Sequence, residues 1–334
     1  MKKLERLIKS FNGRKVVVVG DIVADEFVYG RTTRLSREAP VPIVRYERAD
    51  YMPGGAANAA NNVAAMGGVV IPVGVVGMDE PGRQIVGMFQ DKGVETGSLI
   101  QDRSRPTVSK TRIFAGDIGT VMQQMLRLDR GGFGDVTGKL RLAIVERFRK
   151  AVQTADCVIF SDYGEGVLCD HMRDEMLAIA RRRGVVITAD SRFKVHMFAG
   201  VHALTPNLPE LMQFARRDLI GVEEIEKAAA SLQRKTGARG VLVKRGSNGV
   251  AMYKRGKPFQ IYPPHGSAEV ADVTGAGDTV IAAFSLALSV GAEMNEAAQI
   301  ANIAGGIKVT KRGTATVSTA EILRELHAIS RQDG

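Results

Sequence analysis

Short runs of β-branched residues alternate with segments of helical periodicity along most of this chain, and this alternation limits its possible folds more than any other feature. The runs that we predict as buried strands are Lys15–Val19 (KVVVV), Val69–Val76, Cys157–Ser161, Val185–Ala189 and Gly240–Lys244. Amphipathic segments such as Arg173–Arg183 and Glu223–Thr236 lie between these runs. Because alternating strands and helices form a parallel sheet covered on both faces, we predict a doubly wound, mostly parallel α/β core.

Two stretches, Phe27–Tyr51 and Arg105–Leu128, break the alternation and show no helical period. We predict that they form a small β-sheet that acts as a lid over a site. In this division, residues 1–26, 52–104 and 129–330 form the core, and 27–51 and 105–128 form the lid. Since exposed edge strands tend to pair with other strands, we expect a homodimer through the lid.

The composition is that of a protein without targeting or membrane segments. The first residues, MKKLERLIKSF, are interrupted by charges, so we do not expect a signal peptide. The longest apolar stretch, Ile281–Ala292, is shorter than the ~20 residues that a membrane helix needs. The two cysteines match no zinc-binding spacing, and such sparse use indicates a reducing compartment. We therefore expect a cytoplasmic protein with no membrane partner.

The net charge of +10 is compatible with nucleic acid, acidic membranes or phosphorylated small molecules as partners. The basic residues are scattered, no aromatic residues lie among them, and tryptophan is absent. Because single-stranded bases would have few side chains to stack on, we expect no nucleic-acid partner. A salt titration of nucleic-acid binding would test the alternative of a basic RNA-associated protein.

The strongest motif is Asp272-Val-Thr-Gly-Ala-Gly-Asp278-Thr279, which is followed at once by an apolar helix over Val280–Val290. Small residues before a helix leave backbone N–H groups free, and the helix dipole adds positive charge there. Gly275, Ala276 and Gly277 therefore predict an anion hole for a phosphoryl group. A carboxylate at position 278 would repel a phosphate, but it is suited to remove the proton of a hydroxyl beside it. The alternative is that Asp278 only caps the helix.

A second motif, Pro53-Gly-Gly-Ala-Ala-Asn58, opens a helix of small residues. Gly54 and Gly55 let the backbone approach a ligand closely, and the amide of Asn58 suits sugar hydroxyls. The alternative is a tightly packed helix start. The chain contains no P-loop, no G-x-G-x-x-G after the first strand, no H-E-x-x-H and no G-x-S-x-G, and its five histidines are scattered.

Together, the two motifs resemble the signatures of the ribokinase-like, or PfkB, carbohydrate kinases, and the resemblance covers most of the chain. It implies an ATP-dependent sugar kinase that uses Mg²⁺ and, in some members, a monovalent cation such as K⁺. Asp278 then matches the catalytic base, and Asp21 matches a carboxylate that binds sugar hydroxyls. The resemblance places the following residues at the nucleotide and its metal: Asn207, Lys244, Gly246, Gly249 and Asn302, with Glu210 acting indirectly on Mg²⁺.

Without the resemblance, the same residues have structural interpretations. Asn207 and Glu210 have the spacing of a capping box, Gly246 and Gly249 could make a hairpin turn, and Asp21 could end its strand.

Within the family, the chain is most similar to the heptose 7-phosphate kinases of lipopolysaccharide precursor synthesis. The segments that carry this similarity are Gly20–Asp25, Ser36–Pro42, Pro53–Asn58 and Asp272–Thr279. The chain departs from that group at Glu165, where lysine is frequent, and at Asp190-Ser-Arg192-Phe, where Asp-Pro-Lys-Gly is frequent. Many members also carry a C-terminal nucleotidyltransferase, for which we expect no room here.

A sugar phosphate requires a cationic contact. Lys110 and Arg112 lie two apart in a predicted strand, so both side chains leave the same face and could hold a dianion. The alternative is a solvated strand face. Arg37 and Arg192 are weaker candidates.

These observations predict transfer of the γ-phosphoryl group of ATP to a small-molecule sugar or sugar phosphate, with the anomeric hydroxyl of D-glycero-D-manno-heptose 7-phosphate as the preferred acceptor. Two alternatives stay open. One is a kinase for another sugar, sugar phosphate or nucleoside, and the other is a non-catalytic sugar- or nucleotide-binding protein on a kinase fold. The carboxylate at position 278 favours catalysis, since binding alone does not need it.

Overall fold

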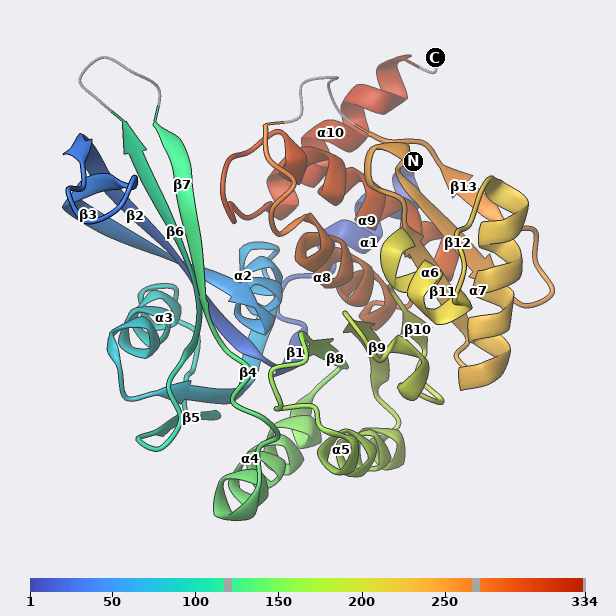
Figure 1. Cartoon of the computed structure of the whole chain (residues 1–334). Coiled ribbons are helices and arrows are strands. Elements are labelled where there is room, and N and C mark those ends of the chain that lie inside the picture. The colour runs from blue at the N-terminus through green and yellow to red at the C-terminus, as the bar shows by residue number, and fades with distance from the viewer. Residues whose placement is uncertain (117–121, 266–270, 333–334) are drawn as a thin grey trace.

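The computed structural model describes residues 1–116, 122–265 and 271–332. Within these residues, nine strands form one large sheet in the order β13-β12-β11-β10-β9-β8-β1-β4-β5 (Figure 1). Only the pairs β11–β12 and β12–β13 are antiparallel. The strands are β1 (Lys15–Gly20), β4 (Val69–Gly77), β5 (Leu99–Asp102), β8 (Cys157–Asp162), β9 (Val186–Ser191), β10 (Ala203–Leu204), β11 (Gly240–Lys244), β12 (Val250–Lys254) and β13 (Gln260–Tyr262). The predicted doubly wound, mostly parallel sheet is confirmed.

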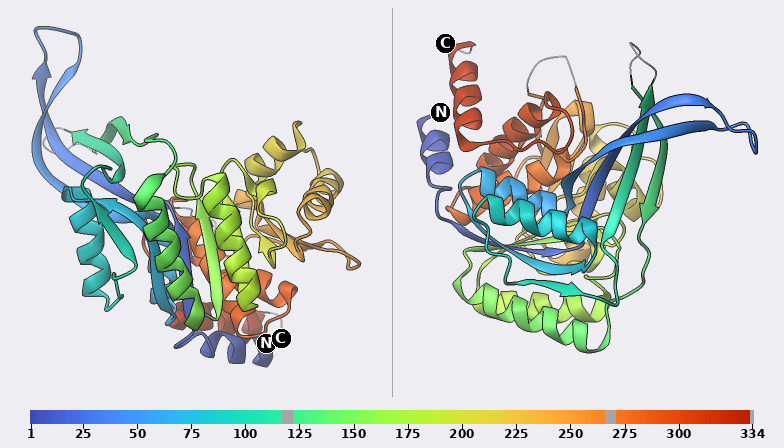
Figure 2. Two further views of the ribbon diagram at one scale, coloured as in Figure 1. Left: turned by 90° about the horizontal axis from the view of Figure 1, so that it is seen from below. Right: turned by 90° about the vertical axis from the view of Figure 1, so that its left-hand side faces the viewer.

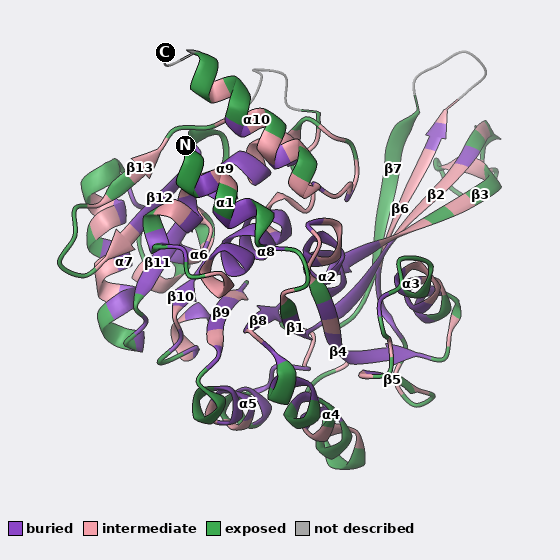
Figure 3. Ribbon diagram, turned by 180° about the vertical axis from the view of Figure 1, so that it is seen from behind, coloured by how far each residue is buried: buried purple, intermediate pink, exposed green. Residues whose placement is uncertain are grey.

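Helices cover both faces of the large sheet (Figure 2). Those on one face are α1 (Lys2–Lys9), α2 (Ala56–Ala65), α8 (Ala276–Ser289), α9 (Met294–Val309) and α10 (Thr319–Gln332). Those on the other face are α4 (Gly138–Ala151), α5 (Asp170–Arg183), α6 (Leu208–Ala215) and α7 (Val222–Thr236). The central strands β1 and β8 are mostly purple in Figure 3, because each strand has apolar side chains on both faces. No helix in the described part of the chain is long and apolar enough to cross a membrane.

A second sheet of four strands, in the order β3-β2-β6-β7, projects from the core (Figures 1 and 2). Its strands are β2 (Ile22–Leu35), β3 (Pro42–Gly55), β6 (Val108–Gly116) and β7 (Gln123–Arg130). The prediction of a small second sheet from the two irregular stretches is confirmed. The strands extend beyond 27–51 at both ends, because β2 begins one residue after Asp21 and β3 ends where α2 begins. The division into a core and a lid remains a prediction.

The remaining helix, α3 (Glu80–Asp91), lies beside β4 and the small sheet. Its start is capped by Asp79, which accepts a hydrogen bond from Gly82 N at 3.1 Å. In the core, α5 and α7 end at Gly184 and Gly237, which adopt the left-handed conformation that favours glycine. β1 ends at Gly20 and β2 begins at Ile22, so the carboxyl end of this central strand meets the base of the small sheet.

Candidate active site

The helix α8 begins with a left-handed glycine. Gly275 has φ +75°, and a Cβ atom added to it would lie 2.5 Å from the amide nitrogen of Asn58. Both the backbone conformation and the close approach of Asn58 therefore require glycine at this position. Gly277 faces a cation, since its Cβ would lie 3.3 Å from Lys244 Nζ.

The first N–H groups of α8 are only partly free. Ala276 N donates to Val273 O at 3.2 Å. Within the described residues, the N–H groups of Gly275, Gly277 and Asp278 make no hydrogen bond. An incoming anion could therefore accept hydrogen bonds from these three N–H groups. The N–H group of Ala276 is already used within the turn.

Asp278 is the third residue of α8, and its side chain makes no capping hydrogen bond. The side chain is buried, and each of its oxygens accepts one hydrogen bond: Oδ1 from the Tyr163 hydroxyl at 2.8 Å and Oδ2 from Asn58 Nδ2 at 2.7 Å. Burial raises the pKa of Asp278 to about 6, although both hydrogen bonds act to lower it. The interpretation of Asp278 as a simple cap is wrong, and a buried carboxylate with a pKa near neutral is suited to general base catalysis.

Asn58 is fixed by a chain of buried polar groups. Its Oδ1 accepts from Asn62 Nδ2 at 3.2 Å, and Asn62 Oδ1 accepts from Thr279 Oγ1 at 2.9 Å. Helix α2 is thereby joined to α8 on either side of the base. In the structure, the side-chain amide of Asn58 donates to Asp278. A contact of Asn58 with sugar hydroxyls stays a prediction.

Asp21 lies between β1 and β2 and holds the turn that follows β8. Its carboxylate accepts from the backbone N–H groups of Tyr163, Glu165 and Val167 at 2.8–3.1 Å. Burial and the nearby Asp162 raise its pKa to about 6 against these bonds. Asp21 therefore shapes the site, and a contact with a sugar hydroxyl stays a prediction. Next to it, Gly55 has φ +55° and a Cβ there would lie 2.7 Å from Asp21 O, while a Cβ at Gly54 would lie 2.5 Å from Asp25 Oδ2.

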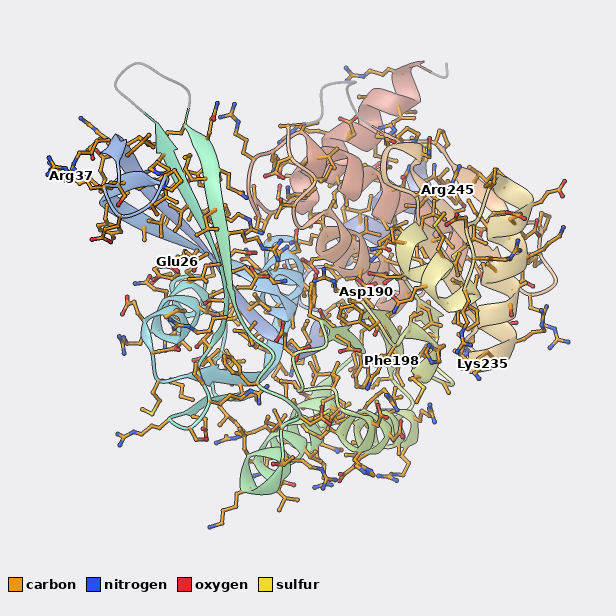
Figure 4. All side chains as sticks on the ribbon, viewed as in Figure 1. Glu26, Arg37, Asp190, Phe198, Lys235 and Arg245 are labelled. Atoms are coloured by element: carbon orange, nitrogen blue, oxygen red, sulfur yellow. The ribbon has the colours of Figure 1, made fainter. Side chains whose placement is uncertain are left out.

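The carboxyl ends of β9 and β11 bring together a buried charged cluster. Lys244 Nζ lies 2.7 Å and 2.8 Å from the two carboxylate oxygens of Asp190. Burial opposes the charge on Lys244, but Asp190 and Glu210 outweigh it and raise the pKa of Lys244. Figure 4 shows Asp190 at the centre of the molecule.

Asn207 and Glu210 form a capping box at the start of α6, which is the structural interpretation of their spacing in the sequence. Glu210 accepts from Asn207 N at 2.7 Å and from Asn207 Nδ2 at 2.8 Å. Burial and the neighbouring Asp190 raise the pKa of Glu210 to about 7. Two neighbouring, partly buried carboxylates beside one lysine suit Mg²⁺, which takes one or two protein carboxylates together with substrate phosphates.

Two predicted nucleotide contacts have clear structural roles. Gly246 and Gly249 form the turn between β11 and β12, and a Cβ at Gly249 would lie 2.2 Å from Tyr262 O. Asn302, on α9, donates to Pro263 O at 2.7 Å. Their contacts with a nucleotide stay predictions.

Lys110 and Arg112 leave the same face of β6, beside Asp25 and Phe27 of β2. Arg112 is engaged in an ion pair with Asp25 at 2.7 Å, and both side chains are mostly buried. Lys110 has no carboxylate within ion-pair distance among the described residues, and its Nζ lies 5.4 Å from the centroid of the Tyr163 ring. Burial, with the nearby charge of Arg192, lowers the pKa of Lys110. Of these two cations, Lys110 is therefore the one that the described carboxylates leave available for a ligand.

The other candidates differ in position. Arg192 lies close enough to Lys110 and Glu210 to affect both their pKa values, and with Glu210 it lines a cavity of about 470 Å³. Arg37 lies at the far tip of the small sheet, away from Asp190 (Figure 4). Glu165 accepts a hydrogen bond from Gly132 N at 2.8 Å, so its carboxylate is used within the fold.

The sequence interpretation missed two residues of this centre. These are Tyr163, which contacts Asp278, and Asp190, which pairs with Lys244. A signal was available in each, since both lie at the carboxyl end of a predicted parallel strand, where sites form.

The comparisons with known proteins agree with this geometry. The family described as pfkB family carbohydrate kinase matches residues 14–321. The bifunctional protein HldE of Gluconacetobacter diazotrophicus is 37% identical over 95% of this chain, and that of Mesorhizobium japonicum is 38% identical over 96%. The chain spans 65% and 63% of the lengths of these two relatives.

Solved structures show the same fold at low identity. Arabidopsis thaliana ribokinase, solved with ribose and ATP, has a TM-score of 0.75 at 22% identity, covering 94% of this chain and 99% of that one. Phosphofructokinase-2 of Escherichia coli, solved with substrates and products, has a TM-score of 0.78 at 17% identity, covering 95% and 99%. The fold is therefore ribokinase-like. From the family match and the identity to curated relatives, this chain belongs to the pfkB family of carbohydrate kinases, which are ATP-dependent sugar kinases.

Proposed function

We propose that this chain transfers the γ-phosphoryl group of ATP to the anomeric hydroxyl of D-glycero-D-manno-heptose 7-phosphate. The observation that carries the transfer is the buried carboxylate of Asp278 beside free N–H groups at the start of α8. Asp278 accepts the proton of the attacking hydroxyl, and the N–H groups of Gly277 and Asp278 stabilise charge on the transferred phosphoryl group.

The nucleotide side of the site is assigned to Asn207, Glu210, Lys244 and Asn302. Mg²⁺ supplies neutralisation of the phosphate charge when it is bound. Glu210 and Asn207 orient it, and Lys244 contributes a fixed positive charge beside Gly277. Closure of the small sheet over the cleft excludes water and so limits ATP hydrolysis.

The choice of a phosphorylated sugar is supported by Lys110 and by the relatives named HldE. Lys110 is half-buried on the small sheet and lacks a carboxylate partner within ion-pair distance among the described residues, and Arg192 lies near it. Two neighbouring cations are stabilised by a dianion that binds both. Glu165 does not weaken this assignment by repulsion alone, since its carboxylate is bonded to Gly132.

The deciding experiment compares phosphorylated and unphosphorylated sugars at equal concentration with ATP and Mg²⁺. We expect the highest kcat/KM for the heptose 7-phosphate. A higher kcat/KM for an unphosphorylated hexose or a nucleoside would refute the heptose assignment and leave the kinase assignment standing. No turnover of any sugar, with intact nucleotide binding, would favour the non-catalytic alternative.

We further propose a homodimer through the small sheet. Its edge strand β7 is exposed along its whole length, and Leu126 and Leu128, both more than half exposed, lie on its outer face. A second copy would cover this apolar edge. Light scattering should give twice the monomer mass for the wild type and the monomer mass for Leu126→Lys combined with Leu128→Lys. A monomeric wild type at micromolar concentration would contradict this proposal.

A further inference from the structure

Tyr163 connects the two acidic residues at the centre of the site. It follows β8 directly, its backbone N–H donates to Asp21 Oδ2 at 2.8 Å, and its hydroxyl donates to Asp278 Oδ1 at 2.8 Å. Tyr163 is therefore held at its backbone by Asp21 and contacts Asp278 through its hydroxyl.

The carboxylate of Asp278 is held from two sides. Tyr163 donates to one oxygen from the turn after β8, and Asn58 donates to the other from α2. A carboxylate oxygen has two lone-pair sites, so each oxygen keeps one site for an incoming hydroxyl. The two donors thus restrict rotation of the carboxylate without blocking it.

Lys110 places a lid cation over the same tyrosine. Its Nζ lies 5.4 Å from the centroid of the Tyr163 ring, within the range of a cation–π contact. A cation over the ring draws electron density from the phenol and makes its hydroxyl a stronger donor. The lid strand β6 and the base on α8 are therefore linked through one side chain.

We propose that Tyr163 is a positioning residue that fixes the Asp278 carboxylate for proton abstraction and couples it to Lys110 of the lid. The inference rests on the proposed function, since it concerns the same base. In the step, the proton of the sugar hydroxyl passes to a free lone pair of Asp278, the sugar oxygen bonds to the γ-phosphorus, and ADP leaves with the electrons of the broken P–O bond. Tyr163 keeps its own proton, because burial and the charge of Asp278 raise its pKa well above the ordinary value.

The groups around Asp278 determine whether its pKa should rise or fall when one of them is removed. Burial raises the pKa of Asp278, and the bonds from Asn58 and Tyr163 lower it. Loss of the Tyr163 hydroxyl should therefore raise the pKa of Asp278 further. The other ionisable groups that act on Asp278 come from three elements, and they are Asp190 on β9, Lys244 on β11 and Lys308 on α9.

The test measures the pKa of Asp278 directly in the ligand-free protein, by NMR titration of aspartate carboxyl carbons. The Asp278 signal is assigned by its loss in Asp278→Asn. In Tyr163→Phe, we expect the pKa of Asp278 to rise by about one unit or more, as loss of a hydrogen bond to a charged group implies. In Lys110→Met, a smaller rise is expected. An unchanged pKa in Tyr163→Phe would overturn the role of Tyr163, and an unchanged pKa in Lys110→Met would overturn the link to the lid.

Tyr51→Phe is the matched control. It removes a phenol that donates to Glu26 at 2.8 Å on the outer face of the lid, and it should leave the Asp278 titration unchanged. If Tyr163→Phe does not fold, replacement of all six tyrosines by fluorotyrosine tests the reverse direction. A more acidic phenol is a stronger donor, so the pKa of Asp278 should fall, and an unchanged value would again overturn the proposal.

The pH dependence of the kinetics is a second test, and it can fail independently of the titration. The acid limb of kcat/KM should move from near pH 6 to about pH 7 in Tyr163→Phe, with an unchanged KM for ATP. A limb that does not move would contradict the inference. If the wild type does not phosphorylate the heptose 7-phosphate, the proposed substrate is wrong, while the titration still decides the role of Tyr163.

Discussion

The centre around Asp278 and the small sheet differ in how completely their polar groups are paired. In the centre, Asp278, Asn58 and Asp21 accept or donate hydrogen bonds to groups from other elements of the core. In the small sheet, β7 is exposed along its length and Lys110 lacks a carboxylate partner among the described residues. The polar groups around Asp278 are paired before any ligand arrives, whereas Lys110 on the small sheet has no carboxylate within ion-pair distance among the described residues.

This difference follows from burial. A buried carboxylate without partners would be very costly, so the fold must supply donors to Asp278 from within. Lys110 is only half-buried and loses part of its hydration, so binding of a phosphate can supply the close counter-charge that the described carboxylates do not. Reaction chemistry should therefore depend mainly on the core and substrate choice mainly on the small sheet, with the contact of Lys110 and Tyr163 as the proposed link between them, and the predictions below test this division.

The largest effect is expected from loss of the base. Asp278→Asn should lower kcat by at least ~10²-fold, the lower range for general base catalysis, while nucleotide binding and the fold are kept. Single-turnover kinetics with ATP and calorimetric ATP binding would measure both. Near-normal turnover in this variant would show that the paired centre has only a structural role.

The two regions should respond to pH with opposite sign. The pKa of Asp278 is about 6 in the folded state against 3.8 without burial, so its stabilising contribution is complete below pH 4 and is lost as the pH rises through 6. The free energy of unfolding of Asp278→Asn relative to wild type should therefore increase by about 1–3 kcal/mol between pH 4 and 7.

Asp129 on the small sheet is the carboxylate with which we compare Asp278. A hydrogen bond with Arg127 lowers the pKa of Asp129, so its contribution is present at neutral pH and is lost as the pH falls. Asp129→Asn should become less stable than wild type towards neutral pH, by a small amount because the pair is exposed. Chemical denaturation at several pH values measures the free energy of unfolding of both variants. A pH dependence of the same sign in both variants would contradict the predicted difference between the two regions.

The start of α8 should tolerate no side chain at Gly275. Gly275→Ala forces a left-handed conformation on alanine and brings its Cβ within 2.5 Å of Asn58 Nδ2. We expect a loss of about 1–3 kcal/mol in stability together with lower turnover. The matched control is Gly184→Ala, which has a similar φ of +72° but open space around it, so that it isolates the backbone strain. An equal effect of the two substitutions on kcat would show that contact with Asn58 is unimportant.

The smallest effect is expected on the lid and should be confined to one substrate. Lys110→Met should raise the KM for the sugar phosphate roughly tenfold, since a charge-assisted contact is worth ~1.5–3 kcal/mol and ~1.4 kcal/mol corresponds to a factor of ten. The KM for ATP should hardly change. Arg31→Met, which removes a lid cation paired with Glu47, should change neither KM. An equal rise in both KM values for Lys110→Met would place Lys110 outside the sugar site.

The fold could be predicted from the sequence because it depends on local patterns. The runs of valine and isoleucine in β1, β4 and β8 are unambiguous, and so is the glycine-rich start of α8. The position of Asp278 at the start of α8 could be predicted for the same reason, and its role as the base is the proposal made above.

The partners of these residues could not be predicted, because they depend on register and on distant contacts. The ion pair of Arg112 with Asp25 follows from the parallel pairing of β6 with β2, which no local pattern fixes. Nothing near Tyr163 in the sequence indicates that its hydroxyl reaches α8. The three N–H groups that surround Asp21 belong to a turn whose shape depends on Gly164 and Gly166, both with positive φ.

The hydrogen bonds at the base also bear on how the protein matures during synthesis. Asn58 and Asp278 are 220 residues apart in sequence, and Tyr163 and Asp278 are 115 apart. A nascent chain can form the strands and the small sheet early, but it lacks the base until α8 has left the ribosome. The cost of closing such long loops adds to this delay. Phosphoryl transfer should therefore appear late in biogenesis, after most of the molecule has folded.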